Sequence, residues 1–207
     1  STSPWAWADL VEGWSWDGQE GKPVRVDVYS NAHEVELFLN GSSLGRQAVA
    51  TENAGTLLAN TAQFDATYNT GELLAVSYVD GAESGRCILR SAEGARQLKL
   101  ELEHIDGPGS FSGDGQGLAH IALSIVGSNG QLFNQAQELI EVSVSGPAEL
   151  AGFGSSLPNP TVPYTASVQN VFDGRALAIV RITGPGEVTF TAKCDGLGEQ
   201  VVTFTAL

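Results

Sequence analysis

Apolar and polar residues alternate along much of this chain. Valine stands at every second position of residues 24–29, and residues 34–41 continue the alternation as far as Asn40-Gly41. A period of two indicates a β-strand with one buried face, so Val35, Leu37 and Leu39 should point inward and Phe38 and the glutamates outward. Asn-Gly favours a two-residue hairpin turn, because both of its residues must adopt positive φ. The sequence therefore predicts a β-hairpin here.

Similar runs predict strands throughout the rest of the chain. They cover residues 63–68, 72–79, 86–90, 97–104, 118–126, 138–144, 175–182, 188–192 and 201–205. Gly146-Pro147 should end one strand, and residues 152–170, with three prolines, predict a long irregular connection. No stretch of useful length has the 3.6-residue period of a helix. We predict an all-β protein with two tandem immunoglobulin-like β-sandwich domains.

The length of 207 residues suits two sandwiches of roughly 100 residues each. Residues 91–95 are small and polar, as expected of a linker. We therefore predict one domain over residues 1–92, comprising a tryptophan-rich N-terminal segment and the first sandwich. Residues 93–207 should form the second sandwich. The chain contains no methionine and begins with Ser1, so we expect it to be a piece of a longer protein.

Net charge limits the partners that the chain can have. Ten Lys and Arg residues stand against 24 Asp and Glu residues, which gives a formal net charge of −14. Such a surface repels nucleic acid and anionic lipid, and no apolar run is long enough to span a membrane. We therefore expect neither nucleic acid nor a membrane as a partner. Neutral sugars and other proteins remain compatible with this charge.

The four tryptophans of the chain are all near its beginning. Trp5 and Trp7 form one pair, Trp14 and Trp16 another, and an i, i+2 spacing puts both rings of a pair on one side of an extended segment. One interpretation is a platform on which sugar rings stack. The other is packing, either onto the core of the same domain or onto a neighbour. The position at the end of the chain favours packing.

No metal site and no cofactor is predicted. The three histidines are scattered without the spacing of metal ligands. Cys87 and Cys194 are too far apart in sequence to suggest a disulfide framework, and we expect both to be small buried side chains.

Several motifs together resemble the region that follows the catalytic barrel in bacterial β-galactosidases of glycoside hydrolase family 2. In the first half these motifs are Trp-Ser-Trp at 14–16, Gly-Lys-Pro-Val at 21–24, and residues 28–32, 34–41, 71–73 and 78–81. The second half resembles the C-terminal immunoglobulin-like domain of those enzymes, through Asp114-Gly115 and residues 118–121, 144–148, 152–155 and 172–181. Residues 127–130, Gly-Ser-Asn-Gly, depart from the acidic residue that often begins the corresponding turn.

The resemblance implies hydrolysis of terminal β-galactosides by two glutamates on an upstream (β/α)₈ barrel. No position of this chain matches the motifs of those glutamates, so no catalytic residue is predicted here. Glu34 and Glu36 would lie about 6.6 Å apart along one strand face. Retaining glycoside hydrolysis needs two carboxyl groups about 5 Å apart, one with a raised pKa. Nothing near this pair in the sequence would raise a pKa, and a solvated face is the better interpretation.

The expected function is that of a non-catalytic accessory region of a larger β-galactosidase-like glycoside hydrolase. It would pack on the catalytic barrel of the same polypeptide and help to shape the sugar site. Trp5, Trp7, Trp14 and Trp16 are the candidate sugar or interdomain contacts. One alternative is an independent carbohydrate-binding module that takes a galactoside-type sugar, with Tyr164 as a further aromatic platform. Another is a generic cell-surface immunoglobulin-like interaction module.

Overall fold

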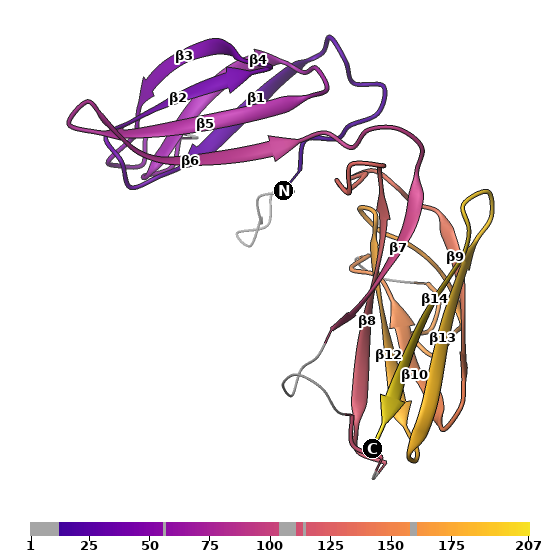
Figure 1. The fold of residues 1–207 in the computed structure, drawn as a ribbon. Helices are drawn as coiled ribbons and strands as arrows, with labels where there is room; N and C mark the ends of the chain where they lie inside the picture. Colours follow the sequence, from indigo (N-terminus) through magenta and orange to yellow (C-terminus); the bar gives the residue numbers. More distant parts are fainter. Residues whose placement is uncertain (1–12, 56, 104–110, 114, 158–160) are drawn as a thin grey trace. The chain divides into compact units, whose positions relative to one another are not determined.

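The structure is a computed structural model that describes residues 13–55, 57–103, 111–113, 115–157 and 161–207. In this part of the chain every regular element is a β-strand, and no helix that could cross a membrane is present. The chain folds into two compact units, Ser1–Ser91 (unit 1) and Ala92–Leu207 (unit 2) (Figure 1). Each unit is built from antiparallel sheets. The predicted all-β class with two immunoglobulin-like β-sandwiches is confirmed.

The described residues of unit 1 form a two-stranded sheet and a four-stranded sheet. The smaller sheet pairs β1 with β4, and the larger one has the order β3-β2-β5-β6. The strands are β1 (Pro23–Tyr29), β2 (Glu34–Leu39), β3 (Ser42–Ala48), β4 (Thr61–Thr67), β5 (Glu72–Val79) and β6 (Ala82–Arg90).

Two hairpin turns of unit 1 follow from their sequences. Asn40 and Gly41 have φ of 50° and 77°, and Asp80 and Gly81 have φ of 50° and 80°, as a type I′ turn requires. The hairpin predicted at Asn40-Gly41 is therefore confirmed, and Asp80-Gly81 forms a second hairpin by the same rule. The Asn40 side chain also accepts a hydrogen bond from the amide of Glu72 at 2.8 Å and donates one to the Thr70 carbonyl at 2.9 Å. Asn40 thus fixes its own turn and the neighbouring one.

The core of unit 1 lies between its two sheets. Val35, Leu37 and Leu39 of β2 are buried, as the alternation predicts, and pack with Phe64 of β4 and Leu73 of β5. Because the two-stranded sheet is narrower than the four-stranded one, it leaves part of the inner face uncovered. A groove of about 410 Å³ lies there, between the end of β1 and the inward-facing residues of β5 and β6.

In the part of unit 2 that the structure describes, the strands form two four-stranded sheets, with the orders β10-β12-β8-β7 and β11-β9-β13-β14. Its strands are β7 (Gln97–Glu103), β8 (Leu118–Val126), β9 (Leu139–Ser145), β10 (Ala148–Gly154), β11 (Val168–Asn170), β12 (Arg175–Ile182), β13 (Gly186–Cys194) and β14 (Gly198–Ala206).

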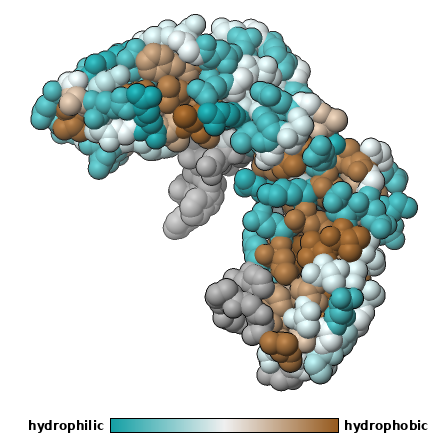
Figure 2. Space-filling view, in the orientation of Figure 1, coloured by the Kyte–Doolittle hydropathy of each residue, from teal (hydrophilic) through white to brown (hydrophobic). Residues whose placement is uncertain are grey.

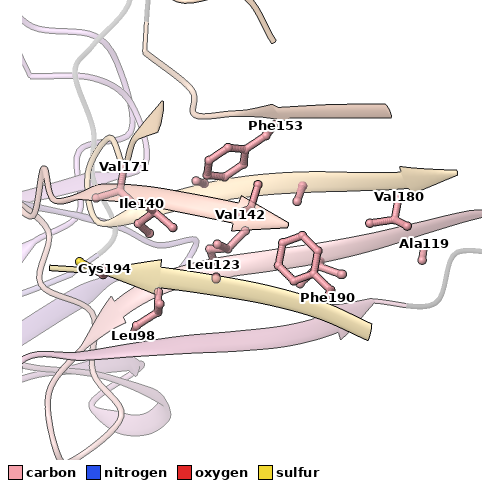
Figure 3. Close-up of a cluster of buried hydrophobic side chains, with 14 of the residues drawn as sticks. Leu98, Ala119, Leu123, Ile140, Val142, Phe153, Val171, Val180, Phe190 and Cys194 are labelled. Carbon is pink, nitrogen blue, oxygen red and sulfur yellow. The ribbon is translucent and has the colours of Figure 1, made fainter. Parts of the chain in front are cut away.

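The inner faces of these two sheets supply one continuous apolar core. Leu123 and Val180 come from one sheet, Ile140 and Phe190 from the other, and all four are almost fully buried (Figure 3). At the edge where β7 and β14 meet, the core reaches the surface, and Figure 2 shows apolar side chains gathered there.

Two predictions about structure are wrong. Residues 152–170 are not irregular throughout, because β10 extends to Gly154 and β11 begins at Val168. A bulge between Leu150 and Gly152 breaks the period of two in β10, which hides the strand in the sequence. Cys194 is buried as expected, whereas Cys87 is exposed. Cys87 points inward from β6, but it lines the groove that the narrow sheet leaves open.

Candidate binding surfaces

The described tryptophans form an aromatic cluster within unit 1. The rings of Trp14, Trp16 and Tyr68 contact one another edge to face, with centroids 5.1–5.4 Å apart. The indole of Trp14 donates to the carbonyl of Asn69 at 2.9 Å, and the amide of Trp16 donates to the Tyr68 hydroxyl at 2.9 Å. These contacts anchor the N-terminal segment to the end of β4.

This packing decides what each tryptophan offers to a ligand. Trp14 is only 2% exposed, so neither face of its ring is open to a sugar. Trp16 is half-buried and lines a small hollow with Lys22 and Pro23. Trp5 and Trp7 lie outside the described residues.

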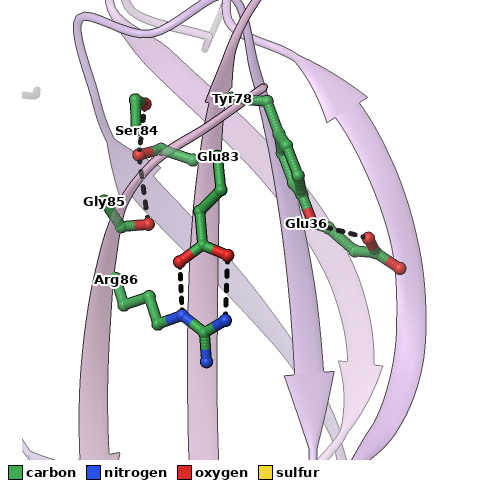
Figure 4. A network of polar contacts seen from close by, with 7 residues as sticks. Glu36, Tyr78, Glu83, Ser84, Gly85 and Arg86 are labelled. Atoms are coloured by element: carbon green, nitrogen blue, oxygen red, sulfur yellow. Dashed lines mark hydrogen bonds and ion pairs between the residues drawn. The ribbon is translucent and has the colours of Figure 1, made fainter. Parts of the chain in front are cut away.

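The glutamates of β2 belong to a cross-strand polar network on the outer face of the four-stranded sheet. Glu36 accepts a hydrogen bond from Ser43 Oγ at 2.7 Å. It accepts a second one from the Tyr78 hydroxyl at 3.3 Å, which Figure 4 shows. Glu34 pairs with Arg46 at 2.8 Å, and the Arg46 guanidinium stacks over the Tyr78 ring. Desolvation of the Tyr78 phenol, followed by the negative charge of Glu36, raises the pKa of Tyr78.

This arrangement does not fit a catalytic carboxyl pair. Glu34 is paired with Arg46 of β3, and Glu36 accepts hydrogen bonds from Ser43 of β3 and Tyr78 of β5, so both carboxylates are held by partners on neighbouring strands. Within the described residues, no three His, Cys, Asp or Glu side chains gather as metal ligands would. The network serves to tie β2, β3 and β5 together.

A row of apolar side chains crosses the same outer face. Phe38 of β2 stands opposite Leu74 of β5, and Leu74 stands opposite Ile88 of β6. We call these three residues the apolar row. Ile88 is 42% exposed, and Phe38 and Leu74 are half-buried. Glu36 lies two residues from Phe38 along β2, and Arg86 lies two residues from Ile88 along β6, on the same face of the sheet. Charged residues therefore border the row.

Unit 2 carries a groove on the outer face of the sheet that contains β10 and β12. Its volume is about 590 Å³, and its floor consists of Leu177 and Ile179 of β12 with Gly154 and Gly152 opposite them. Tyr164, which is 54% exposed, forms one wall. We call this hollow the Tyr164 groove. Its polar lining comes from Glu103, Arg175, Ser155 and Ser156.

The position of Tyr164 is fixed by its backbone and by Gly154. The Tyr164 carbonyl accepts a hydrogen bond from the amide of Phe153 at 2.7 Å, and the Pro163 carbonyl accepts one from the Gln169 side chain at 3.0 Å. A Cβ atom on Gly154 would lie 2.4 Å from Cδ1 of the Tyr164 ring. The ring therefore lies against the backbone of Gly154, where no side chain would fit.

The two units match different known domains. Residues 107–203 match the family glycoside hydrolase family 2 C-terminal domain 5, and residues 21–85 match a domain of unknown function, DUF4982. Residues 107–203 therefore match a C-terminal domain of family 2 glycosidases, and the chain as a whole resembles the C-terminal region of such enzymes. The resemblance stated from its motifs is thereby confirmed.

The curated relatives that the chain resembles are much longer than the chain itself. The β-galactosidase BoGH2A of Bacteroides ovatus is 24% identical over 202 residues, which are 95% of this chain and 22% of that protein. A β-glucuronidase of Formosa agariphila is 25% identical over 93% of this chain and 19% of its own length. The chain thus spans about a fifth of the curated relatives that it matches.

Solved structures agree with this assignment. A family 2 member from Bacteroides cellulosilyticus is 35% identical to the chain, with a TM-score of 0.86 over 98% of this chain and 25% of that one. The structure of a family 2 β-glucuronidase gives a TM-score of 0.82 at 25% identity over 94% of this chain. These lengths support the description of the chain as an accessory region of a larger glycosidase.

Neither the apolar row nor the composition of the Tyr164 groove was predicted from the sequence. A signal for the row was present, because Phe38 and Ile88 break the polar phase of their strands. The residues of the groove gave no such signal, since they come from four separate stretches of the chain and meet only when the sheet forms.

Proposed function

We propose that this chain is a non-catalytic accessory region that packs against the catalytic barrel of its own glycoside hydrolase polypeptide. The apolar row on unit 1 is the observation that carries the proposal. Phe38, Leu74 and Ile88 form a continuous strip with a charged border, and an apolar strip of this kind marks an interaction surface.

The length of the relatives indicates what could cover this surface. Only about a fifth of each curated relative corresponds to the chain, so most of such a polypeptide is available to cover the row. Docking within one polypeptide also needs little affinity, because the covalent connection keeps the local concentration high. Contact of Trp5, Trp7 and Trp16 with the barrel belongs to the same proposal.

The activity of the parent protein is proposed from its relatives. Their names include β-galactosidase and β-glucuronidase, and hydrolysis of terminal β-galactosides is the activity that the motifs of this chain imply. Since Glu34 and Glu36 are bound to neighbouring strands, the catalytic acid and nucleophile should come from outside the chain. This region would then help to shape the sugar site by its docked position against the barrel.

The docking proposal can be tested with the parent protein made in two pieces. The 207-residue chain and the remainder of the polypeptide would be mixed, and complex formation measured by analytical ultracentrifugation. The double variant Leu74→Lys/Ile88→Lys should weaken the complex at least about tenfold, because it places two charges in an apolar contact. Hydrolysis of nitrophenyl β-galactoside and β-glucuronide by the reassembled protein would establish the substrate class.

Leu58→Lys is the matched control. Leu58 is an exposed leucine of unit 1 outside the apolar row, so its replacement should leave the complex intact. Circular dichroism of each variant would verify that unit 1 remains folded. Equal binding by the double variant and the control would contradict the docking surface, and glycosidase activity in the 207-residue chain alone would contradict the non-catalytic assignment.

A further inference from the structure

We propose that the Tyr164 groove of unit 2 binds a single neutral hexopyranose ring of the β-galactoside type. This site is separate from the apolar row of unit 1, and the proposal does not depend on docking to a barrel. The shape of the groove, its aromatic wall and the charges at its border support this ligand.

The groove has the size and surface of a small-molecule site. A volume of about 590 Å³ lies within the range of roughly 300–1,000 Å³ that is common for ligand pockets. Leu177 and Ile179 give an apolar floor, and glycines at 152 and 154 on the paired strand leave that floor flat beside them. A flat apolar floor beside an aromatic wall accommodates a saturated ring better than an extended peptide.

Tyr164 supplies the surface on which a sugar ring would stack. Tyr164 is 54% exposed, yet its backbone is fixed, because the carbonyls of Tyr164 and Pro163 accept hydrogen bonds from Phe153 and Gln169. One side of the ring lies against Gly154, so its orientation is set before a ligand arrives. Such preorganisation reduces the conformational entropy lost on binding. The negative face of an aromatic ring attracts the polarised C–H groups of a pyranose.

The charged residues of the groove favour a neutral ligand with hydroxyl groups. Arg175 and Glu103 line the groove, and neither makes an ion pair with another described residue. Arg175 can donate hydrogen bonds to hydroxyl oxygens, and Glu103 can accept hydrogen bonds from hydroxyl groups. One positive and one negative group give no local net charge, while the chain carries −14 overall. With no net charge in the lining itself, the acidic surface around it disfavours a sugar that carries a carboxylate.

A galactose ring fits this combination best. In β-galactopyranose the C–H bonds at positions 3, 4 and 5 point to one side of the ring, because the hydroxyl at position 4 is axial. That side presents a continuous apolar patch of the size of one tyrosine ring. The hydroxyl groups at the opposite side and the rim remain free for Arg175, Glu103 and the hydroxyls of Ser155 and Ser156.

The test is a titration of the ¹⁵N-labelled 207-residue chain with methyl β-D-galactopyranoside, followed by NMR. We expect saturable shifts in the amides of residues 152–156 and 175–179, with a dissociation constant in the millimolar range. Tyr164→Ala should weaken binding at least about tenfold, whereas Tyr164→Phe, which keeps the ring, should retain most of it. Glu103→Gln should weaken binding severalfold.

Two matched controls separate binding from general surface effects. Tyr29→Ala removes a tyrosine of similar exposure from unit 1, and Glu101→Gln changes an exposed glutamate on the same face of β7 that does not line the groove. Both should bind as the original chain does. Absence of saturable shifts, or full binding by Tyr164→Ala, would overturn the proposal. A preference for methyl β-D-glucuronide would overturn the neutral ligand class.

Discussion

At the scale of single residues, the two cysteines are in opposite environments. Cys194 lies at the end of β13 and is 2% exposed, and desolvation, aided by the charges of Glu138 and Asp195, raises the pKa of its thiol. Cys87 is exposed on β6, facing the groove that the two-stranded sheet does not cover. The thiolate is the reactive form of cysteine, so burial and a raised pKa both protect Cys194.

Thiol labelling should distinguish the two cysteines. With a maleimide or a disulfide reagent at pH 8, the native chain should react rapidly at one thiol, and at two after denaturation. Cys87→Ser should abolish the rapid reaction, and Cys194→Ala should leave it unchanged. Mass spectrometry of the labelled peptides provides the measurement. Equal labelling rates of Cys87 and Cys194 in the native chain would show that the core of unit 2 is open at this end of β13.

At the scale of elements, strands with regular alternation could be predicted from sequence, and the disturbed ones could not. β5, β8 and β12 begin and end at the predicted residues. β8 and β12 keep one buried phase throughout, and turns at Gly71 and Asp80-Gly81 bound β5. β10 was missed because its bulge shifts the phase and its glycines remove the side chains that would reveal it. Turns with positive φ, at Asn40 and Asp80, were predictable because few residue types tolerate that conformation.

The two faces of β2 should differ sharply in their effect on stability. Leu37 is fully buried, so Leu37→Ala should lower the free energy of unfolding of unit 1 by about 2–5 kcal/mol through lost burial and a cavity. Glu36→Gln keeps hydrogen-bond acceptors for Ser43 and Tyr78 on the outer face and should cost less than about 1 kcal/mol. Urea denaturation, followed by tryptophan fluorescence, measures both changes, since Trp14 packs in the same core. Similar losses in the two variants would show that the outer network matters as much as the core.

At the scale of the whole molecule, the sequence predicted the class of fold better than the candidate binding surfaces. The resemblance to family 2 enzymes rested on turns and strands that are close together in sequence. The apolar row joins three strands, and the Tyr164 groove joins β7, β10, β12 and the segment that carries Tyr164. Such surfaces depend on strand order and register, which alternation alone does not determine. The sequence could name Tyr164 as an aromatic platform, but not Arg175 or Glu103 as its neighbours.

The two units should unfold as separate cooperative transitions. Their buried side chains form distinct clusters, one containing Leu37 and the other Phe190, and none of the described buried residues belongs to both. Scanning calorimetry of the 207-residue chain should resolve two transitions, each with an enthalpy of roughly 60–80 kcal/mol at domain size. Leu37→Ala should lower the midpoint of one transition and Phe190→Ala that of the other, because each substitution removes packing from only one core. A single transition, shifted by both substitutions, would instead show that the two cores are energetically coupled and that the chain behaves as one cooperative domain.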